Sequence, residues 1–396
     1  MRLSIVIPAY DEEHAIADII QRCLKEREHI KKETPVADVE IIVVNDGSRD
    51  NTAIIAGQFK EISLISYEKN KGYGAAIKTG FAQATGDIVG FLDADGTCDP
   101  HYFIPLSNAL IKQQADVVIG SRMTPASKMP AVRKAGNLFF ALLINLLGNA
   151  RITDAASGMR VIRRNSLSKL YPLPDGLHFT PAMSCKAVLD RGIKILEVPM
   201  NYEERIGESK LGVVQDGVRF LKTIIDIALT YEPFKFFGIT GLIFLLVGFF
   251  YGIYPLVYYL QFRLVPDYMI YRLITVTVLI VSSFTLFTVG IISDDITSLI
   301  NRRRREQGIF KALICNMLSQ KKLIIAGIVS PLCGIIINYK TIWQYITTGS
   351  IYVPWFYVVT GAFFVLVGLQ SLALGVLQRI LSLLRASREQ NNCEDS

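Results

Sequence analysis

The sequence has few charged residues, and its cysteines follow no pairing pattern. Asp, Glu, Lys and Arg make up only 19% of the 396 residues. The six cysteines are scattered along the chain with no C-x-x-C pair, and no histidine stands at zinc-ligand spacing beside them. This pattern argues against a disulfide framework and predicts reduced thiols or buried fillers, consistent with a cytoplasmic catalytic part.

Two common phosphate-binding motifs are missing as well. There is no Walker A sequence, and Gly72 and Gly74 do not complete a dinucleotide-binding fingerprint because Ile77 stands where a third glycine is required. Two interpretations of these glycines remain. They form a tight loop that lets the backbone approach a ligand, or they form an ordinary turn before a helix.

The sequence also lacks the signals of secretion and of nucleic-acid binding. The first apolar run is too short for a signal peptide and reaches charged residues at Asp11. The net charge of +7 suits an anionic membrane surface or phosphate-bearing ligands. No compact basic helix or basic-aromatic pattern accompanies that charge, so nucleic acid is not among the expected partners.

Apolar runs alternate with charged stretches up to about Tyr231, as in an α/β domain. We expect helices between the strands, and this alternation predicts a mainly parallel, Rossmann-like sheet. The expected strands share short β-branched-rich runs and lie at 3–7, 39–44, 62–66, 88–92, 116–122 and 193–198. An apolar helix at 138–147 is too short to span a bilayer and is either interfacial, as Arg133 and Lys134 favour, or buried in the core.

Two carboxylates, Asp93 and Asp95, directly follow the apolar run 88–92. Ligands bind outside the carboxyl ends of the strands in open α/β sheets. Neighbouring carboxylates repel each other, and a hard cation such as Mg²⁺ or Mn²⁺ neutralises both. We therefore expect this pair to hold a metal–nucleotide-diphosphate group; the alternative is a solvated turn.

Long uncharged stretches follow Pro233 and predict four transmembrane helices, at about 234–262, 269–293, 323–340 and 352–378. An amphipathic helix within 211–233 leads into them. Basic residues cluster between the second and third spans and after the fourth, including the run Arg302 to Arg305. The positive-inside rule then places both termini and the N-terminal domain in the cytoplasm, which makes the chain a multi-pass membrane protein.

Four motifs stand in order along the first part of the chain: Pro8-Ala9-Tyr10-Asp11-Glu12-Glu13, Val44-Asn45-Asp46-Gly47-Ser48, Asp93-Ala94-Asp95-Gly96 and Glu204-Arg205-Ile206-Gly207-Glu208-Ser209-Lys210. They resemble, in the same order, motifs of family-2 glycosyltransferases with the GT-A fold. Among these the chain looks most like the dolichyl- or polyprenyl-phosphate glycosyltransferases, the dolichol-phosphate mannose synthase group. The resemblance covers about residues 1–235.

The resemblance implies roles for residues that bind the donor. Asp93 and Asp95 are then the catalytic pair, with Asp93 at the nucleotide sugar and Asp95 as the metal ligand on its diphosphate. Arg205 and Lys210 lie on a loop that closes over the diphosphate. The residues expected at the nucleotide sugar are Pro8, Tyr10, Glu12, Asp46, Ser48 and Gly72. Thr97 stands where the mannose synthases usually have a metal-binding Gln, so its hydroxyl is the expected second metal ligand.

The resemblance places Arg122 and Arg133 on the phosphate of a lipid acceptor, with Asn137 nearby. A lipid monophosphate is mostly dianionic at pH 7 and is already a nucleophile, so no side-chain base is needed. The protein must align two phosphate-bearing substrates and stabilise the departing nucleoside diphosphate. Asp154 remains open between a catalytic role and a bond to Arg160 or a backbone amide.

These inferences give a domain organisation: a cytoplasmic GT-A domain at 1–210, a juxtamembrane region at 211–233, four transmembrane helices within 234–385 and a polar cytoplasmic tail at 386–396. The expected reaction is inverting, metal-dependent transfer of a hexosyl unit from GDP-mannose or a UDP-hexose to polyprenyl or dolichyl phosphate. The helices anchor the enzyme in the bilayer, and assembly into a homo-oligomer is left open. The alternatives are a processive polysaccharide synthase, whose Q-x-x-R-W motif is absent here, and a non-catalytic nucleotide-binding membrane scaffold.

Overall fold

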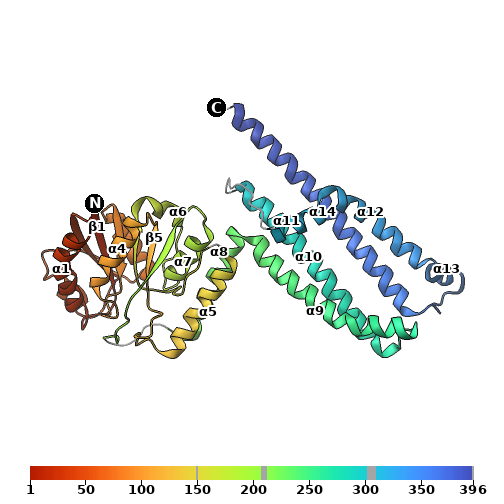
Figure 1. Cartoon of the computed structure of the whole chain (residues 1–396), viewed down its shortest axis with the longest axis horizontal. Helices are drawn as coiled ribbons and strands as arrows, with labels where there is room; N and C mark the ends of the chain where they lie inside the picture. The colour runs from red at the N-terminus through yellow and green to blue at the C-terminus, as the bar shows by residue number, and fades with distance from the viewer. Residues whose placement is uncertain (149, 207–211, 301–308, 395–396) are drawn as a thin grey trace. The chain divides into compact units, whose positions relative to one another are not determined.

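The structure is a computed structural model that describes residues 1–148, 150–206, 212–300 and 309–394. Its chain divides into two compact units, Met1–Tyr231 and Glu232–Ser396 (Figure 1). Each unit has its own architecture: a sheet covered by helices in the first and, over the residues that the structure describes, helices without strands in the second.

The first unit contains a seven-stranded sheet in the order β3-β2-β1-β4-β6-β5-β7. Only β6 runs antiparallel to its neighbours β4 and β5, so the predicted mainly parallel α/β sheet is confirmed. The strands are β1 (Arg2–Ala9), β2 (Asp38–Asn45), β3 (Ser63–Ser66), β4 (Ile88–Leu92), β5 (Val117–Ser121), β6 (Met159–Arg163) and β7 (Ile195–Pro199).

The sequence analysis missed β6, because two of its five residues are arginines. Arg160 lies on this strand with its whole side chain buried. Such a charged strand lacks the apolar run that marks its neighbours, and it becomes a strand here through pairing on both sides.

Helices pack on both faces of this sheet, and β1 lies at the centre of the core. Ile5 and Ile7 belong to the main apolar cluster together with Ile16, whereas Val6 points to the opposite face. There, a Cβ on Gly80 would lie only 2.3 Å from the Val6 side chain, so its helix packs very close to the sheet. The helices of this unit are α1 (Ile16–Glu33), α2 (Thr52–Ala56), α3 (Tyr73–Gln83), η1 (Pro100–Tyr102), α4 (Phe103–Lys112), α5 (Ala131–Leu147), η2 (Arg164–Ser166), α6 (Leu167–Leu170), α7 (Phe179–Leu189) and α8 (Val213–Tyr231).

Helices α5 and α8 each have two apolar faces. One face of α8 buries Phe220, Ile224 and Ala228, while Val214 and Val218 are exposed. Helix α5 buries Asn137, Ala141, Ile144 and Leu147 and exposes the large apolar side chains Val132, Leu138, Phe139, Leu142 and Leu146. These two helices therefore combine core packing with an uncovered apolar surface on the first unit.

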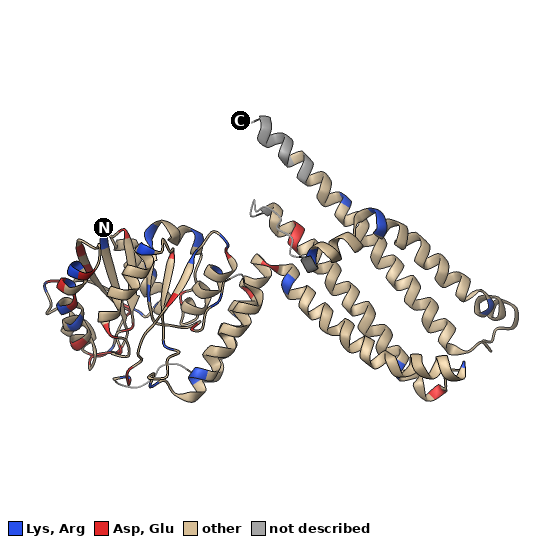
Figure 2. Ribbon diagram, in the orientation of Figure 1, with Lys and Arg blue, Asp and Glu red and all other residues tan. Residues whose placement is uncertain are grey.

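The second unit consists of α9 (Pro233–Phe262), η3 (Asp267–Met269), α10 (Ile270–Ile300), α11 (Ile309–Met317), α12 (Gln320–Ile337), α13 (Tyr339–Thr348) and α14 (Trp355–Glu394). Four of its segments are long and apolar enough to cross a membrane: Pro233–Phe262, Asp267–Leu299, Gln320–Ile337 and Trp355–Leu384. Figure 2 shows how few charged residues lie along them. Helix α9 packs on α10, and α12 packs on α14. The short helices α11 and α13 were not expected.

Candidate active site

A cavity of about 510 Å³ lies within the first unit, where the carboxyl ends of β1, β2 and β4 meet. Parallel strands bring the segments that follow them to one edge of the sheet, so residues far apart in sequence share this cavity. The predicted site residues that line it are Pro8, Tyr10, Glu12, Asp46, Gly72, Asp93, Asp95, Thr97, Arg122, Arg133, Asn137 and Arg205.

Of the predicted residues that the structure describes, Ser48 does not line the cavity. The Ser48 hydroxyl accepts a hydrogen bond from the backbone N–H of Asp11 at 3.0 Å, so it shapes the turn next to the cavity. Lys210 lies outside the described residues.

Asp95 is buried at the centre of a polar cluster. The Thr97 hydroxyl donates to Asp95 Oδ1 at 2.6 Å, and Arg205 Nη1 donates to Asp95 Oδ2 at 2.8 Å. The other end of the same guanidinium pairs with Glu12. Arg205 thus joins an acid that follows β1 to an acid that follows β4.

Backbone pairing brings Arg205 to this position. The N–H of Glu203 donates to the Thr97 carbonyl at 3.0 Å, and the N–H of Ile206 donates to the Asp95 carbonyl at 3.1 Å. Gly96 adopts a φ of +76° between these contacts and faces the Ile206 side chain. The segment 203–206 therefore lies directly along the acidic turn.

Asp93 is held next to Asp95 by an aromatic hydroxyl. Tyr73, the first residue of α3, donates to Asp93 Oδ1 at 2.6 Å. Burial, followed by the negative charge of Asp95, raises the pKa of Asp93 to about 7 despite this hydrogen bond. Behind the carboxylate lies Gly158, where a Cβ would be 1.8 Å from Asp93 Oδ2.

A buried ion pair lies under the basic part of the cavity. Arg122 binds Asp154 through two parallel bonds, Nε to Oδ2 and Nη2 to Oδ1, both 2.8 Å long. Burial alone would raise the pKa of Asp154, but the guanidinium and its hydrogen bonds hold that pKa below its usual value. One edge of Arg122 is therefore committed to Asp154, a forked geometry that leaves the rest of the guanidinium at the cavity.

Asn137 is engaged with the same pair. Its amide donates to Asp154 Oδ1 at 3.0 Å and accepts from the backbone N–H of Ala156 at 3.1 Å. Its contacts therefore fix the loop that carries Asp154. The expected bond from Asp154 to a backbone amide is confirmed, because Asp154 accepts from the backbone N–H groups of Arg122 at 2.9 Å and Ala156 at 3.2 Å. The expected bond to Arg160 is wrong: Arg160 donates to the carbonyls of Ala155 and Ser157.

Another part of the cavity wall is built around Asp46. Its two carboxylate oxygens accept the backbone N–H groups of Lys71 and Gly72, at 2.7 and 2.9 Å. Gly72 has a φ of +106°, and a Cβ there would lie 2.5 Å from the Asp175 carbonyl oxygen. Because Gly72 has no side chain, the Asp175 backbone can approach it closely. Gly72 itself lies on the cavity wall.

The donors at this site suit a hard divalent cation. Asp93, Asp95, Glu12 and Thr97 offer only oxygen atoms to the cavity. Burial, and then the negative charge of Asp95, raises the pKa of Asp93, and a cation would relieve the repulsion between the two carboxylates. Arg205 supplies part of that positive charge by contacting both Asp95 and Glu12.

Comparison with known proteins identifies the family. The model of Glycosyl transferase family 2 matches residues 4–171, and a domain of unknown function, DUF8752, matches residues 233–392. The dolichyl-phosphate hexose transferase of Haloferax volcanii is 33% identical over 233 residues, which are 57% of this chain and 94% of that protein.

Two further relatives match in part. A dolichyl-phosphate beta-glucosyltransferase of Trichomonas vaginalis is 32% identical over 53% of this chain and 66% of its own length. The dolichyl-phosphate beta-glucosyltransferase of Saccharomyces cerevisiae is 28% identical over 58% of this chain and 75% of its own length.

Among solved structures, glucosyl-3-phosphoglycerate synthase from Mycobacterium tuberculosis aligns with 57% of this chain and 78% of its own. The sequence identity is 21% and the TM-score is 0.44. The Haloferax relative is matched over nearly its entire length, and its identity, the family match and the mainly parallel sheet agree: the chain belongs to glycosyl transferase family 2, with a GT-A catalytic unit.

Proposed function

We propose that this glycosyltransferase moves a hexosyl unit from a nucleotide-diphosphate sugar to dolichyl or polyprenyl phosphate at the cytoplasmic face of a membrane. One observation carries the proposal: a single cavity joins an acidic end, with Asp93 and Asp95, to a basic end, with Arg122 and Arg133. The acidic end suits a cation-bound diphosphate, and the basic end suits a second phosphate.

The names of the relatives favour dolichyl phosphate as the acceptor, and they reduce the choice of nucleotide sugars that could be the donor. The three relatives described above are dolichyl-phosphate hexose or beta-glucosyl transferases. The sequence left two classes of donor open, GDP-mannose and the UDP-hexoses. The two beta-glucosyltransferases among these relatives favour a donor that carries glucose over GDP-mannose. Thr97 in place of the Gln typical of the mannose synthases points the same way.

The mechanism follows from charge and position. The acceptor phosphate is mostly dianionic at pH 7, so it attacks the anomeric carbon directly, with inversion and without a side-chain base. Arg122, oriented by Asp154, and Arg133 hold this nucleophile. Asp95 and Thr97 would hold Mg²⁺ or Mn²⁺, which neutralises the departing diphosphate. Arg205 then exchanges part of its contact with Asp95 for the diphosphate.

The apolar surface of α5 and α8 supports a lipid acceptor. Phe139 and Leu142 are 54% and 68% exposed, and Arg133 on the same helix reaches the cavity. An apolar helix face with basic residues binds the interfacial region of a bilayer. The cavity would then open where the phosphate head of a polyprenol lies.

The direct test offers membranes containing the full chain a panel of labelled nucleotide sugars with dolichyl phosphate. We expect one hexosyl residue on the lipid, and removal of divalent cations should stop its formation. Growth of a long polymer would favour a processive synthase, and the absence of any labelled lipid across the panel would overturn the proposal.

Two variants test the assigned ends of the cavity. Asp95→Asn should reduce transfer by about 100-fold or more, because diphosphate stabilisation is lost, while Asp38→Asn at the far end of β2 should not.

Arg133→Gln should raise the KM for dolichyl phosphate more than the KM for the donor. Lys134→Gln, the neighbouring base outside the cavity wall, is the matched control. Equal effects at positions 133 and 134 would contradict the acceptor role.

A further inference from the structure

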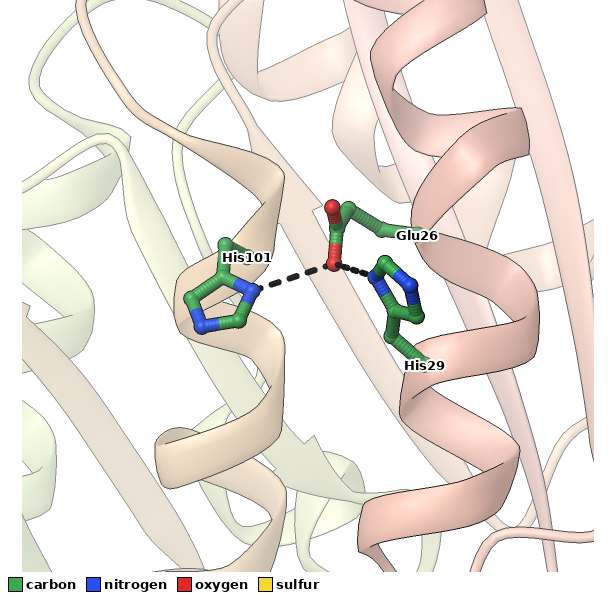
Figure 3. A group of neighbouring side chains, drawn as sticks. All are labelled: Glu26, His29 and His101. Atoms are coloured by element: carbon green, nitrogen blue, oxygen red, sulfur yellow. Dashed lines mark hydrogen bonds and ion pairs between the residues drawn. The ribbon is translucent and has the colours of Figure 1, made fainter.

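Two of the four histidines of the chain converge on one carboxylate, away from the cavity. His29 and Glu26 lie one turn apart on α1, and His101 lies on η1, 75 positions after Glu26. Both imidazole Nδ1 atoms are 3.1 Å from the same oxygen, Glu26 Oε2, as Figure 3 shows. We propose that Glu26, His29 and His101 form a binding site for a zinc-type transition-metal ion.

The separations between the donor atoms support this site. In a tetrahedral site with metal–ligand distances of about 2.0–2.1 Å, neighbouring ligand atoms lie about 3.3 Å apart. The two nitrogen–oxygen separations of 3.1 Å are already close to that value. All three donor atoms lie within 4.8 Å of one another. A small rotation of the two exposed imidazole rings therefore brings their Nδ1 atoms to the separation that a tetrahedral site requires.

The chemistry of the donors selects the type of ion. Imidazole nitrogen suits zinc and similar transition metals, whereas Mg²⁺ and Ca²⁺ prefer oxygen. A neutral imidazole that carries its proton on Nε2 leaves the Nδ1 lone pair for an ion. The site therefore differs in preference from the oxygen-only donors around Asp95.

Access and surroundings also fit. The side chains of His29 and His101 are 49% and 55% exposed, and Glu26 is 14% exposed, so solvent reaches the site and a water molecule can complete the tetrahedron. Beside it, Arg22 on α1 pairs with Asp99 at 3.3 Å, and Asp99 accepts from the backbone N–H of His101 at 3.0 Å. A bound ion would strengthen the link that Glu26 and His101 already form between α1 and η1.

The test uses the full chain, purified in detergent without a histidine tag and stripped of metal. Zn²⁺ is added with excess Mg²⁺, which competes for oxygen-only sites, and bound zinc is measured after gel filtration. We expect one zinc per wild-type chain and none in His29→Asn or His101→Asn. His14→Asn, which changes another exposed histidine, and Asp95→Asn should each keep the ion.

A second readout separates binding from folding. Zn²⁺ should raise the thermal midpoint of the wild-type protein and leave the midpoints of His29→Asn and His101→Asn unchanged, because only the wild-type protein binds the ion when folded. Co²⁺ should give the visible absorption of an imidazole-bound ion in the wild type alone. The proposal is overturned if the wild type binds no zinc, or if the two variants bind as much as the wild type.

Discussion

At the scale of single residues, the acidic turn depends on what stands behind it. Asp93 has room only because position 158 carries no side chain, and Tyr73 fixes the carboxylate from the other side. The carboxylate of Asp95 accepts hydrogen bonds from Arg205 and from the Thr97 hydroxyl. Asp93 and Asp95 are thus held by residues from three segments outside their own turn: Tyr73, Gly158 and Arg205.

Gly158→Ala should displace Asp93 without unfolding the protein, because the clash of 1.8 Å is with the end of a side chain. Misplacing a reacting group by about 1 Å costs on the order of 100-fold in rate. Steady-state transfer assays should show this loss in kcat. The control is Gly252→Ala, where the added Cβ would meet Val276 at an ordinary 3.5 Å. Wild-type activity in the 158 variant would contradict the placement of Asp93.

Asp154→Asn should destabilise the protein by about 3 kcal/mol near neutral pH, because it leaves the largely buried charge of Arg122 unpaired. The pKa of Asp154 is lowered on folding, so its contribution to stability is present above its usual value of 3.8 and is lost as the pH falls below it. Thermal unfolding followed by circular dichroism should show the difference from wild type shrinking in that acidic range. A constant difference across the whole pH range would show that the pair is not responsible.

At the scale of elements, small residues let the apolar helices pack closely. On α12, a Cβ at Gly327 would lie 2.8 Å from the Leu372 backbone, and one at Gly334 would lie 2.8 Å from the Gly361 carbonyl oxygen. Small residues allow such backbone contacts between helices in lipid, where apolar side chains gain little from leaving the solvent.

Gly327→Val should therefore force α12 and α14 apart and lower stability by about 1–3 kcal/mol. The readout is the thermal midpoint of the protein in detergent, with Gly252→Ala as the matched control. Zinc binding should be retained by the folded fraction, since Glu26, His29 and His101 lie in the other unit. A midpoint equal to that of wild type would mean that these helices are not packed as described.

At the scale of the whole molecule, the chain joins a catalytic unit to four helices that can cross a membrane. The positive-inside rule predicts that the catalytic unit and both termini share the cytoplasmic side. In a cysteine-free background, Tyr268→Cys should react with an impermeant maleimide added to intact cells, whereas Lys25→Cys should react only after permeabilisation. Labelling of position 25 from outside would reverse the orientation.

The sequence by itself determined the features encoded by local pattern. The alternation of apolar and charged runs gave the mainly parallel sheet, the acidic pair appeared directly after its strand, and long uncharged runs gave the four candidate spans. These features depend on periodicity and on neighbours within a few positions, which is the range over which sequence patterns act.

Only the tertiary structure decided the pairings. It placed β6 between two strands despite its arginines, paired Asp154 with Arg122, and brought His101 close to Glu26 and His29. These partners lie tens of positions apart, and each is chosen by the packing of sheet and helices, because a buried charge or an imidazole binds whichever group the fold places within reach.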